Sequence, residues 1–179
     1  EWTEIIASFP RGELRDYLEL VSKSGVDIAV KPQYVDKLPK LWDGEVRGLL
    51  QRVDDHGRLD EFAEKTSIKH ILERKLSGLS GGELQRVAIC ATILKEADVY
   101  FFDEPSSYLD IHERMRVVNI IQSLVENGKR IIVIEHDLAI LDVLCDLVHI
   151  VYGQRAAYGI FTPPRTTRTA INAYLDGYL

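Results

Sequence analysis

The feature that most constrains this chain is an apolar run, residues 99–102, that ends on two adjacent carboxylates, Asp103 and Glu104. Large apolar side chains at every position are typical of a strand that is buried on both faces of a parallel sheet. Such a strand holds both carboxylates rigidly at the edge of the sheet. One carboxylate can hold Mg²⁺ while the other positions a water, so we predict Asp103 as the metal contact and Glu104 as a general base.

A segment that suits the binding of an anion precedes this strand. Ser80, Gly81 and Gly82 stand immediately before a helical pattern over residues 83–95. Glycines let backbone N–H groups approach a ligand, and the N-terminus of a helix carries partial positive charge. A Ser-Gly-Gly turn alone is usually only a turn, and a strand that ends in Asp-Glu is often only a solvated strand end. Their occurrence together in this order is more specific.

The rest of the chain alternates strands and helices, which predicts an α/β fold with a parallel core sheet. We expect short helices over residues 1–9 and 13–21, and three more within 44–76, the last capped by Thr66-Ser67. We expect strands over 26–30, 131–134 and 147–152, the second of them buried on both faces. Helices over 110–125 and 138–144, a hairpin over 153–161 and a terminal helix over 166–175 complete the prediction.

Composition narrows the class of protein. The chain has 179 residues, enough for one domain, with 46% hydrophobic and 28% charged residues, as in soluble globular proteins. A net charge of −6 produces no overall attraction to nucleic acid, although a local basic patch stays open. No apolar run approaches the ~20 residues that span a bilayer. The two cysteines, Cys90 and Cys145, cannot supply the four ligands of an iron–sulfur cluster, and we expect them to be buried in a reducing cytosol.

Together these motifs resemble the signature and Walker B segments of ATP-binding cassette ATPases. Residues 107–110 follow as the D-loop does, residues 131–137 hold a strand that ends on His136 as the switch region does, and Gln33 matches the Q-loop. The resemblance implies a P-loop NTPase-type parallel sheet with a helical signature subdomain, and hydrolysis of ATP with Mg²⁺. In these enzymes the catalytic residues would be Glu104 and His136, the nucleotide contacts Gln33, Ser80, Gly81, Gly82 and Asp110, and the metal contacts Asp103 and Gln33.

The geometry of that family implies that the signature acts on the nucleotide of the opposite cassette. The sequence supports the same expectation, because a helix of about 13 residues, roughly 20 Å long, separates Ser80 from the strand that ends at Asp103. The two devices therefore need not converge on one triphosphate.

Three segments, residues 31–36, 103–110 and 133–138, more narrowly resemble the first cassette of the subfamily E proteins, also called RNase L inhibitors. Tyr108 is informative, because transporter cassettes usually carry Ala or Gly at this position. The resemblance implies a cytoplasmic ribosome-recycling factor of archaea or eukaryotes, with no membrane partner. Its partners would be a second ATP-binding cassette of the same protein, the small ribosomal subunit, and release or recycling factors.

The sequence lacks the G-x-x-x-x-G-K-[ST] loop that cradles a triphosphate. We therefore expect residues 1–179 to be a partial cassette, truncated before the Walker A loop, that is inactive by itself. Iron–sulfur clusters are expected only in an N-terminal domain outside this chain. The expected parts are a helix-loop-helix (1–25), a Q-loop region (26–43), a helical signature subdomain (44–95), a core sheet (96–152), and a hairpin and helix leading to a hinge (153–179).

Two other classes of function stay open at this point. The first is the nucleotide-binding subunit of a membrane transporter, against which Tyr108 and the opening helix pair stand. The second is a non-catalytic assembly fragment, which the absence of the Walker A loop permits. A nucleotide-binding assay separates the fragment from the enzyme.

Overall fold

The computed structural model describes residues 2–154 and 156–177. Glu1, Arg155, Tyr178 and Leu179, which belong to the predicted first helix, hairpin and tail, lie outside the described residues. The α-helices are α1 (Trp2–Ser8), α2 (Glu13–Ser24), α3 (Leu38–Leu41), α4 (Val46–Gln51), α5 (Leu59–Lys65), α6 (Gly81–Leu94), α7 (Ile111–Glu126), α8 (Leu138–Leu144) and α9 (Thr167–Leu175). The strands are β1 (Ile28–Lys31), β2 (Val99–Asp103), β3 (Arg130–Ile134), β4 (Leu147–Val148), β5 (Val151–Gln154), β6 (Tyr158–Phe161) and β7 (Arg165–Thr166), and the 3₁₀ turns are η1 (Val35–Lys37), η2 (Lys69–Ile71) and η3 (Leu76–Gly78).

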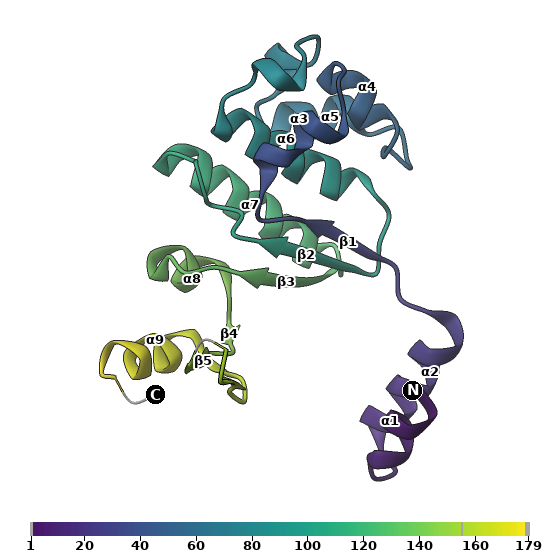
Figure 1. The fold of residues 1–179 in the computed structure, drawn as a ribbon, viewed down its shortest axis with the longest axis vertical. Helices are drawn as coiled ribbons and strands as arrows, with labels where there is room; N and C mark the ends of the chain where they lie inside the picture. The colour runs from purple at the N-terminus through teal and green to yellow at the C-terminus, as the bar shows by residue number, and fades with distance from the viewer. Residues whose placement is uncertain (1, 155, 178–179) are drawn as a thin grey trace.

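A three-stranded parallel sheet, in the order β1-β2-β3, organises the fold (Figure 1). Lys31 pairs with Phe102, and Asp103 pairs with Ile134, so all three strands end at the same edge. The prediction of an α/β fold with a parallel core sheet is confirmed. Because parallel strands share one carboxyl edge, residues that are far apart in the sequence meet there.

Helices α6 and α7 cover one face of this sheet, and the helical subdomain of α3, α4 and α5 packs above them (Figure 1). The core lies between these helices and the sheet, where Phe102, Ile89 and Ile121 are almost fully buried. Cys90 lies in the same core, and burial raises the pKa of its thiol to about 12. An uncharged buried thiol behaves as a small apolar side chain, as the sequence predicted.

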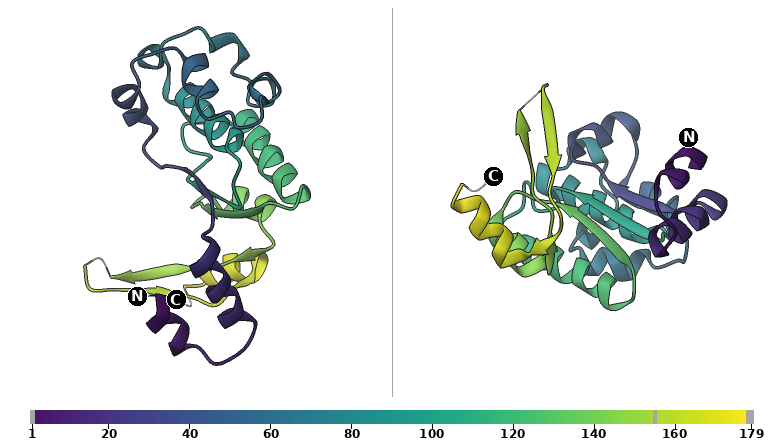
Figure 2. Two further views of the ribbon diagram at one scale, coloured as in Figure 1. Left: turned by 90° about the vertical axis from the view of Figure 1, so that its right-hand side faces the viewer. Right: turned by 90° about the horizontal axis from the view of Figure 1, so that it is seen from below.

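The opposite face of the sheet is not covered by any described helix, and its strands are in view from below (Figure 2, right). Ile28 and Val30 of β1 and Ile132 and Ile134 of β3 are each about half exposed, at 49–58%. The prediction that residues 131–134 are buried on both faces is therefore wrong for the described chain. The reason is that β3 is an outer strand of a sheet with helices on one side only.

The predicted strand over residues 147–152 is also wrong. The segment divides into β4, which pairs antiparallel with β7, and β5, which pairs antiparallel with β6. Neither belongs to the parallel core sheet, so the core sheet ends before the boundary at residue 152 that we expected. The β5–β6 hairpin and the terminal helix α9 agree with their predictions.

The third helix predicted within residues 44–76 is absent from the described residues, which show only the turns η2 and η3 there. Thr66 does not begin a helix but ends α5, and its hydroxyl donates to the carbonyl of Phe62 at 2.6 Å. Ser67 follows in the left-handed region (φ 54°), which turns the chain away from a helical path. The side chain of a threonine can bond forward as a cap or back to the preceding turn, and pattern alone does not distinguish the two.

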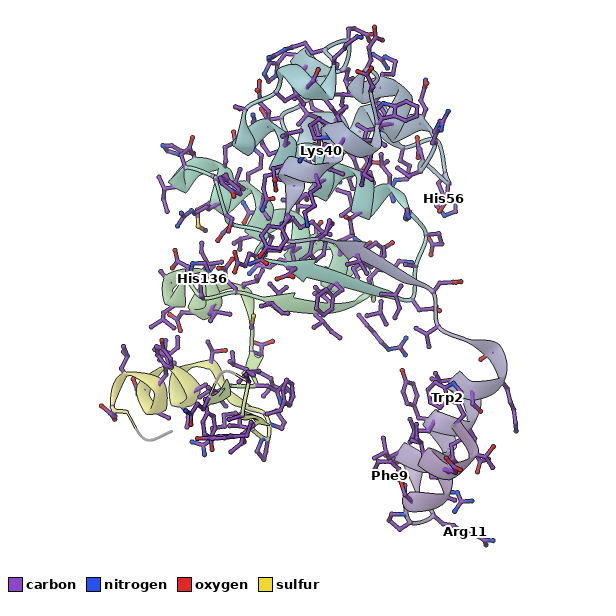
Figure 3. The ribbon with its side chains drawn as sticks, viewed as in Figure 1. Trp2, Phe9, Arg11, Lys40, His56 and His136 are labelled. Atoms are coloured by element: carbon purple, nitrogen blue, oxygen red, sulfur yellow. The ribbon has the colours of Figure 1, made fainter. Side chains whose placement is uncertain are left out.

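Helices α1 and α2 lie apart from the sheet, and neither has a buried residue (Figures 1 and 3). Trp2 and Phe9, labelled in Figure 3, lie within this pair. No helix of the described residues has the length and apolar character that crossing a membrane requires.

Candidate functional site

Glu104 lies immediately after β2, in the left-handed backbone region (φ 47°). Its amide still donates to the carbonyl of Ile134 at 2.9 Å, which continues the pairing with β3 by one residue. A non-glycine residue in this region is under strain, and it persists only where neighbouring groups hold it. The turn directs the Glu104 carboxylate out of the ladder and along the carboxyl edge of the sheet.

Two other predicted site residues, Gln33 and His136, lie at the carboxylate of Glu104. The Gln33 amide donates to Oε1 of Glu104 at 2.9 Å, and Nδ1 of His136 lies 3.7 Å from the same oxygen. Ser107, which the sequence analysis placed in the D-loop without a role of its own, donates to Oε2 at 3.1 Å. The His136 side chain is 76% exposed and lies beyond the end of β3, as Figure 3 shows. A carboxylate with one hydrogen-bond donor on each oxygen is oriented and keeps lone pairs for a proton.

The backbone of the same residue is held by two buried side chains that sequence reasoning missed. Lys31 Nζ donates to the carbonyl of Asp103 at 2.7 Å and to that of Glu104 at 3.2 Å. Gln85, on α6, donates its amide to the carbonyl of Glu104 at 2.7 Å. Burial lowers the pKa of Lys31 to about 8, against the carboxylates of Asp103, Glu104 and Glu135, which raise it.

Weak signals for both residues exist in the sequence. Lys31 is a charged residue at the end of a β-branched run, and Gln85 directly follows Leu84 of the buried stripe of α6. Both side chains are fully buried, as charged and amide side chains rarely are without a partner. A sequence pattern cannot say which carbonyl such a side chain will meet.

The side chains of Asp103 and Gln33 fit Mg²⁺, because each can offer an oxygen ligand. Among the described residues no hydrogen-bond donor reaches the Asp103 carboxylate, and the Gln33 amide nitrogen is engaged by Glu104 while its oxygen is not. In the part of the chain that the structure describes, no group of three His, Cys, Asp or Glu residues could hold a metal alone. Mg²⁺ normally keeps several waters and takes one or two protein ligands together with phosphate oxygens. Asp103 and Gln33 offer that number.

The signature segment forms the N-terminus of α6 with a capping box. The amide of Glu83 donates to Ser80 Oγ at 3.4 Å, and both Ser80 N and Ser80 Oγ donate to Glu83 Oε2, at 2.7 and 2.8 Å. These hydrogen bonds lower the pKa of Glu83, and Arg74 pairs with its other oxygen at 2.8 Å. The Ser80 hydroxyl is therefore engaged, whereas the amides of Gly81 and Gly82 donate to no described residue. Free N–H groups on the first turn of a helix suit an anion.

The length of the helix between them does not keep the signature away from the strand end. Helix α6 starts beside the carboxyl end of β2, since Gln85 in its second turn reaches the carbonyl of Glu104. A Cβ built on Gly82 would lie 2.9 Å from the carbonyl oxygen of Tyr108, so the signature also packs directly on the D-loop. The length of a helix separates its two ends, but the strand returns along the helix and brings its own end back to the start.

Asp110 is not brought to the Glu104 carboxylate. Its Oδ1 accepts from the amides of His112 and Glu113 at 2.9 and 3.0 Å, which makes it the N-cap of α7 and lowers its pKa. Arg86 pairs with Glu113 at 3.1 Å, and so braces α6 against α7.

Glu135 lies in the switch segment, residues 131–137, for which the sequence predicted a role only for His136. Its side chain is fully buried, and its Oε2 accepts from Ser106 Oγ at 2.6 Å. Its Oε1 accepts from the amides of His136 and Asp137 at 2.9 and 3.2 Å. Glu135 thus ties the turn after β2 to the turn that carries His136.

The chain is also similar in sequence to known proteins. Residues 11–107 match the family model described as ABC transporter. A protein of Methanocaldococcus jannaschii, named as an uncharacterized ABC transporter ATP-binding protein, is 48% identical over 178 residues, 99% of this chain and 29% of that protein.

Two solved structures are similar over 100% of this chain. One is the crystal structure of an archaeal ribosome recycling factor, aABCE1, with the ribosomal stalk protein aP1, with a TM-score of 0.91, 47% identity and 35% of that chain covered. The other is a model of ribosome-bound archaeal Pelota and ABCE1, with a TM-score of 0.92, 49% identity and 30% of that chain covered. The chain spans about a third or less of the length of these proteins.

Proposed function

This chain belongs to the ABC transporter family of ATP-binding proteins, and from that premise we propose that it is part of an ATP-hydrolysing cassette of a ribosome-recycling factor. The observation that carries the proposal is the convergence of Gln33, Ser107 and His136 on the carboxylate of Glu104. The similarity to ribosome recycling factors over the whole chain favours this function over a transporter subunit, because family membership alone does not distinguish the two.

In this proposal Glu104 is the general base. Its oxygens accept hydrogen bonds from Gln33 and Ser107, which hold it in one orientation while a free lone pair takes the proton of the attacking water. His136, exposed beside Glu104, reaches the phosphate that leaves. Asp103 and the oxygen of Gln33 would hold Mg²⁺, which would neutralise charge on the phosphates.

Ser80, Gly81 and Gly82 serve the nucleotide of a second ATP-binding cassette of the same protein. This proposal no longer rests on distance, because α6 begins close to Glu104. It rests on family geometry and on the free amides of Gly81 and Gly82 at an exposed helix terminus. In this proposal Asp110 stabilises α7 as its N-cap. The other D-loop residues, 107–109, form the contact between the two cassettes.

The partners that follow from the proposal are the small ribosomal subunit, release or recycling factors and a second cassette, in the cytoplasm and without a membrane protein. The titles of the similar structures name a ribosomal stalk protein and ribosome-bound Pelota as partners of those proteins. Helices α1 and α2 are the segment we propose for the ribosome, since they stand apart from the sheet with their apolar residues exposed. We further propose that a Walker A loop and an iron–sulfur domain belong to other parts of the protein.

The experiment that tests the proposed function is Glu104→Gln in the intact protein, with the second cassette silenced. Glutamine keeps the shape of the side chain but cannot take a proton, so we expect ATP binding to be retained and turnover to fall by ~10²–10⁴-fold. Single-turnover hydrolysis and filter binding of labelled ATP measure the two quantities. Turnover that equals that of the parent protein would remove Glu104 from the role and, with it, the proposed site.

A further inference from the structure

The peptide that joins β2 to the proposed general base has an unusual set of hydrogen-bond donors. The carbonyl of Asp103 accepts from Lys31 at 2.7 Å, and the carbonyl of Glu104 accepts from both Lys31 and Gln85, at 3.2 and 2.7 Å. Glu104 has left the extended conformation of the strand, so its carbonyl no longer has a partner in the sheet. The amide of Ser107 donates to the carbonyl of Glu104 at 3.3 Å, and the two side chains add further donors in place of the ladder.

We propose that Lys31 and Gln85 are positioning residues for Glu104, which fix its left-handed backbone and thereby aim its carboxylate at the attacking water. This inference rests on the proposed function. Neither side chain touches the carboxylate, so both act through the peptide. The carboxylate itself is oriented separately, by Gln33 and Ser107.

Burial makes these two polar side chains costly to keep in the core. Lys31 and Gln85 are both fully buried, and the Oε1 atom of Gln85 has no hydrogen-bond partner among the described residues. A buried polar atom without a partner is destabilising, and a buried amine is costly to desolvate. An apolar side chain of similar length would avoid these two penalties, but it would remove the donors to the carbonyls of Asp103 and Glu104. Each residue places its N–H donor at the carbonyls beside the strained backbone of Glu104.

The two side-chain donors to the Glu104 backbone come from different elements, β1 and α6. Lys31 ends β1, two residues before Gln33, and Gln85 lies in the second turn of α6, five residues after Ser80. The backbone of Glu104 is therefore tied at once to the strand that leads into the Q-loop and to the signature helix. A displacement of α6 pulls on the carbonyl of Glu104 through a single 2.7 Å hydrogen bond.

The test measures hydrolysis by Gln85→Met and Lys31→Met in the intact protein with the second cassette silenced. Each variant keeps an unbranched side chain but loses the donor. We expect kcat to fall at least about tenfold, because a displacement on the order of 1 Å at a reacting group is enough for such a loss. The KM for ATP should change by less than about twofold, since neither side chain contributes to binding.

The matched control is Thr92→Val, which removes a buried hydroxyl from the same helix. Thr92 donates to the carbonyl of Ala88 at 2.9 Å and lies about two helical turns beyond Gln85 on α6. We expect its kcat to equal that of the parent protein. If it loses as much activity as Gln85→Met, general loosening of α6 explains both, and the positioning role is wrong.

A double-variant cycle separates positioning from other roles. In the Glu104→Gln background, adding Gln85→Met should produce no further loss of single-turnover rate, because the group that is positioned is already inactive. A further tenfold loss there, or an unchanged kcat for Gln85→Met alone, overturns the inference. If Lys31→Met does not fold, Gln85→Met still decides. Failure of Glu104→Gln to lower the rate overturns the proposed function instead, so the two failures are distinguishable.

Discussion

Gly82 is the residue at which packing most strictly limits the side chain in the signature segment. A Cβ at this position would lie 2.9 Å from the carbonyl oxygen of Tyr108, which is backbone and cannot turn aside. A Cβ on Gly81 would instead approach the Tyr108 ring at 3.3 Å, and that ring is exposed and free to move. The two glycines therefore have different reasons to be glycine, although they are adjacent on the first turn of α6.

We expect Gly82→Ala to destabilise the start of α6 against the D-loop by about 1–3 kcal/mol, the range for an overpacked contact. Gly81→Ala is the matched control, and its effect should be within about 1 kcal/mol and stabilising, because alanine favours a helix over glycine. Hydrogen exchange of the α6 amides in the intact protein measures both. Equal protection in the two variants would show that the contact with Tyr108 yields freely.

At the scale of single elements, the β5–β6 hairpin depends on one of its two paired glycines. Gly153 and Gly159 are opposite each other in the ladder. A Cβ on Gly153 would lie 2.2 Å from the carbonyl oxygen of Tyr158, whereas nothing lies within 4 Å of a Cβ on Gly159. The hairpin thus brings the two backbones together on the Gly153 side only.

Gly153→Ala should therefore weaken the pairing of the hairpin, because a 2.2 Å contact with a backbone oxygen forces one of the two strands to shift. Gly159→Ala should leave it intact. Limited proteolysis at the hairpin, together with exchange of the paired amides, distinguishes the two variants. Faster cleavage in Gly159→Ala than in Gly153→Ala would contradict this account.

At the scale of the whole molecule, the described chain carries only part of the site that we propose for phosphoryl transfer. The carboxylates and the switch histidine gather at the end of the sheet, but the sequence has no Walker A motif to supply a nest of N–H donors and a lysine. One apolar face of the sheet, with Ile28, Val30, Ile132 and Ile134, is open. We propose that a further cassette segment carrying the Walker A loop covers this face.

We accordingly expect residues 1–179 alone to bind Mg-ATP weakly and not to hydrolyse it. Isothermal calorimetry should give a Kd far above ~1 μM, which corresponds to about −8 kcal/mol. A longer protein that includes the proposed Walker A segment is the control, and it should bind tightly. Micromolar binding by the chain alone would mean that the sites described above hold the triphosphate without that loop.

The sequence by itself determined the elements whose signals are local. The carboxylates at the end of β2 follow from neighbours within a few positions, as do the approximate bounds of α6 and α7. Such signals depend on hydrogen bonds and side-chain spacing inside one element, which residue types alone report. The same locality explains the errors. Whether residues 131–134 are covered, and which strand residues 147–152 join, depends on partners that lie elsewhere in the chain.

Only the tertiary structure decided how the site is held. Lys31 is 73 positions from Glu104 in the sequence and Gln85 is 19, yet both donate to the same carbonyl. The sequence suggested that the signature was remote from the strand end, and the return of β2 along α6 made them neighbours. Parallel pairing aligns the ends of distant strands at one edge, and the burial of each side chain there depends on what every other element contributes. Residue types predict which chemistry the chain carries, and the packing of its elements decides which atoms meet.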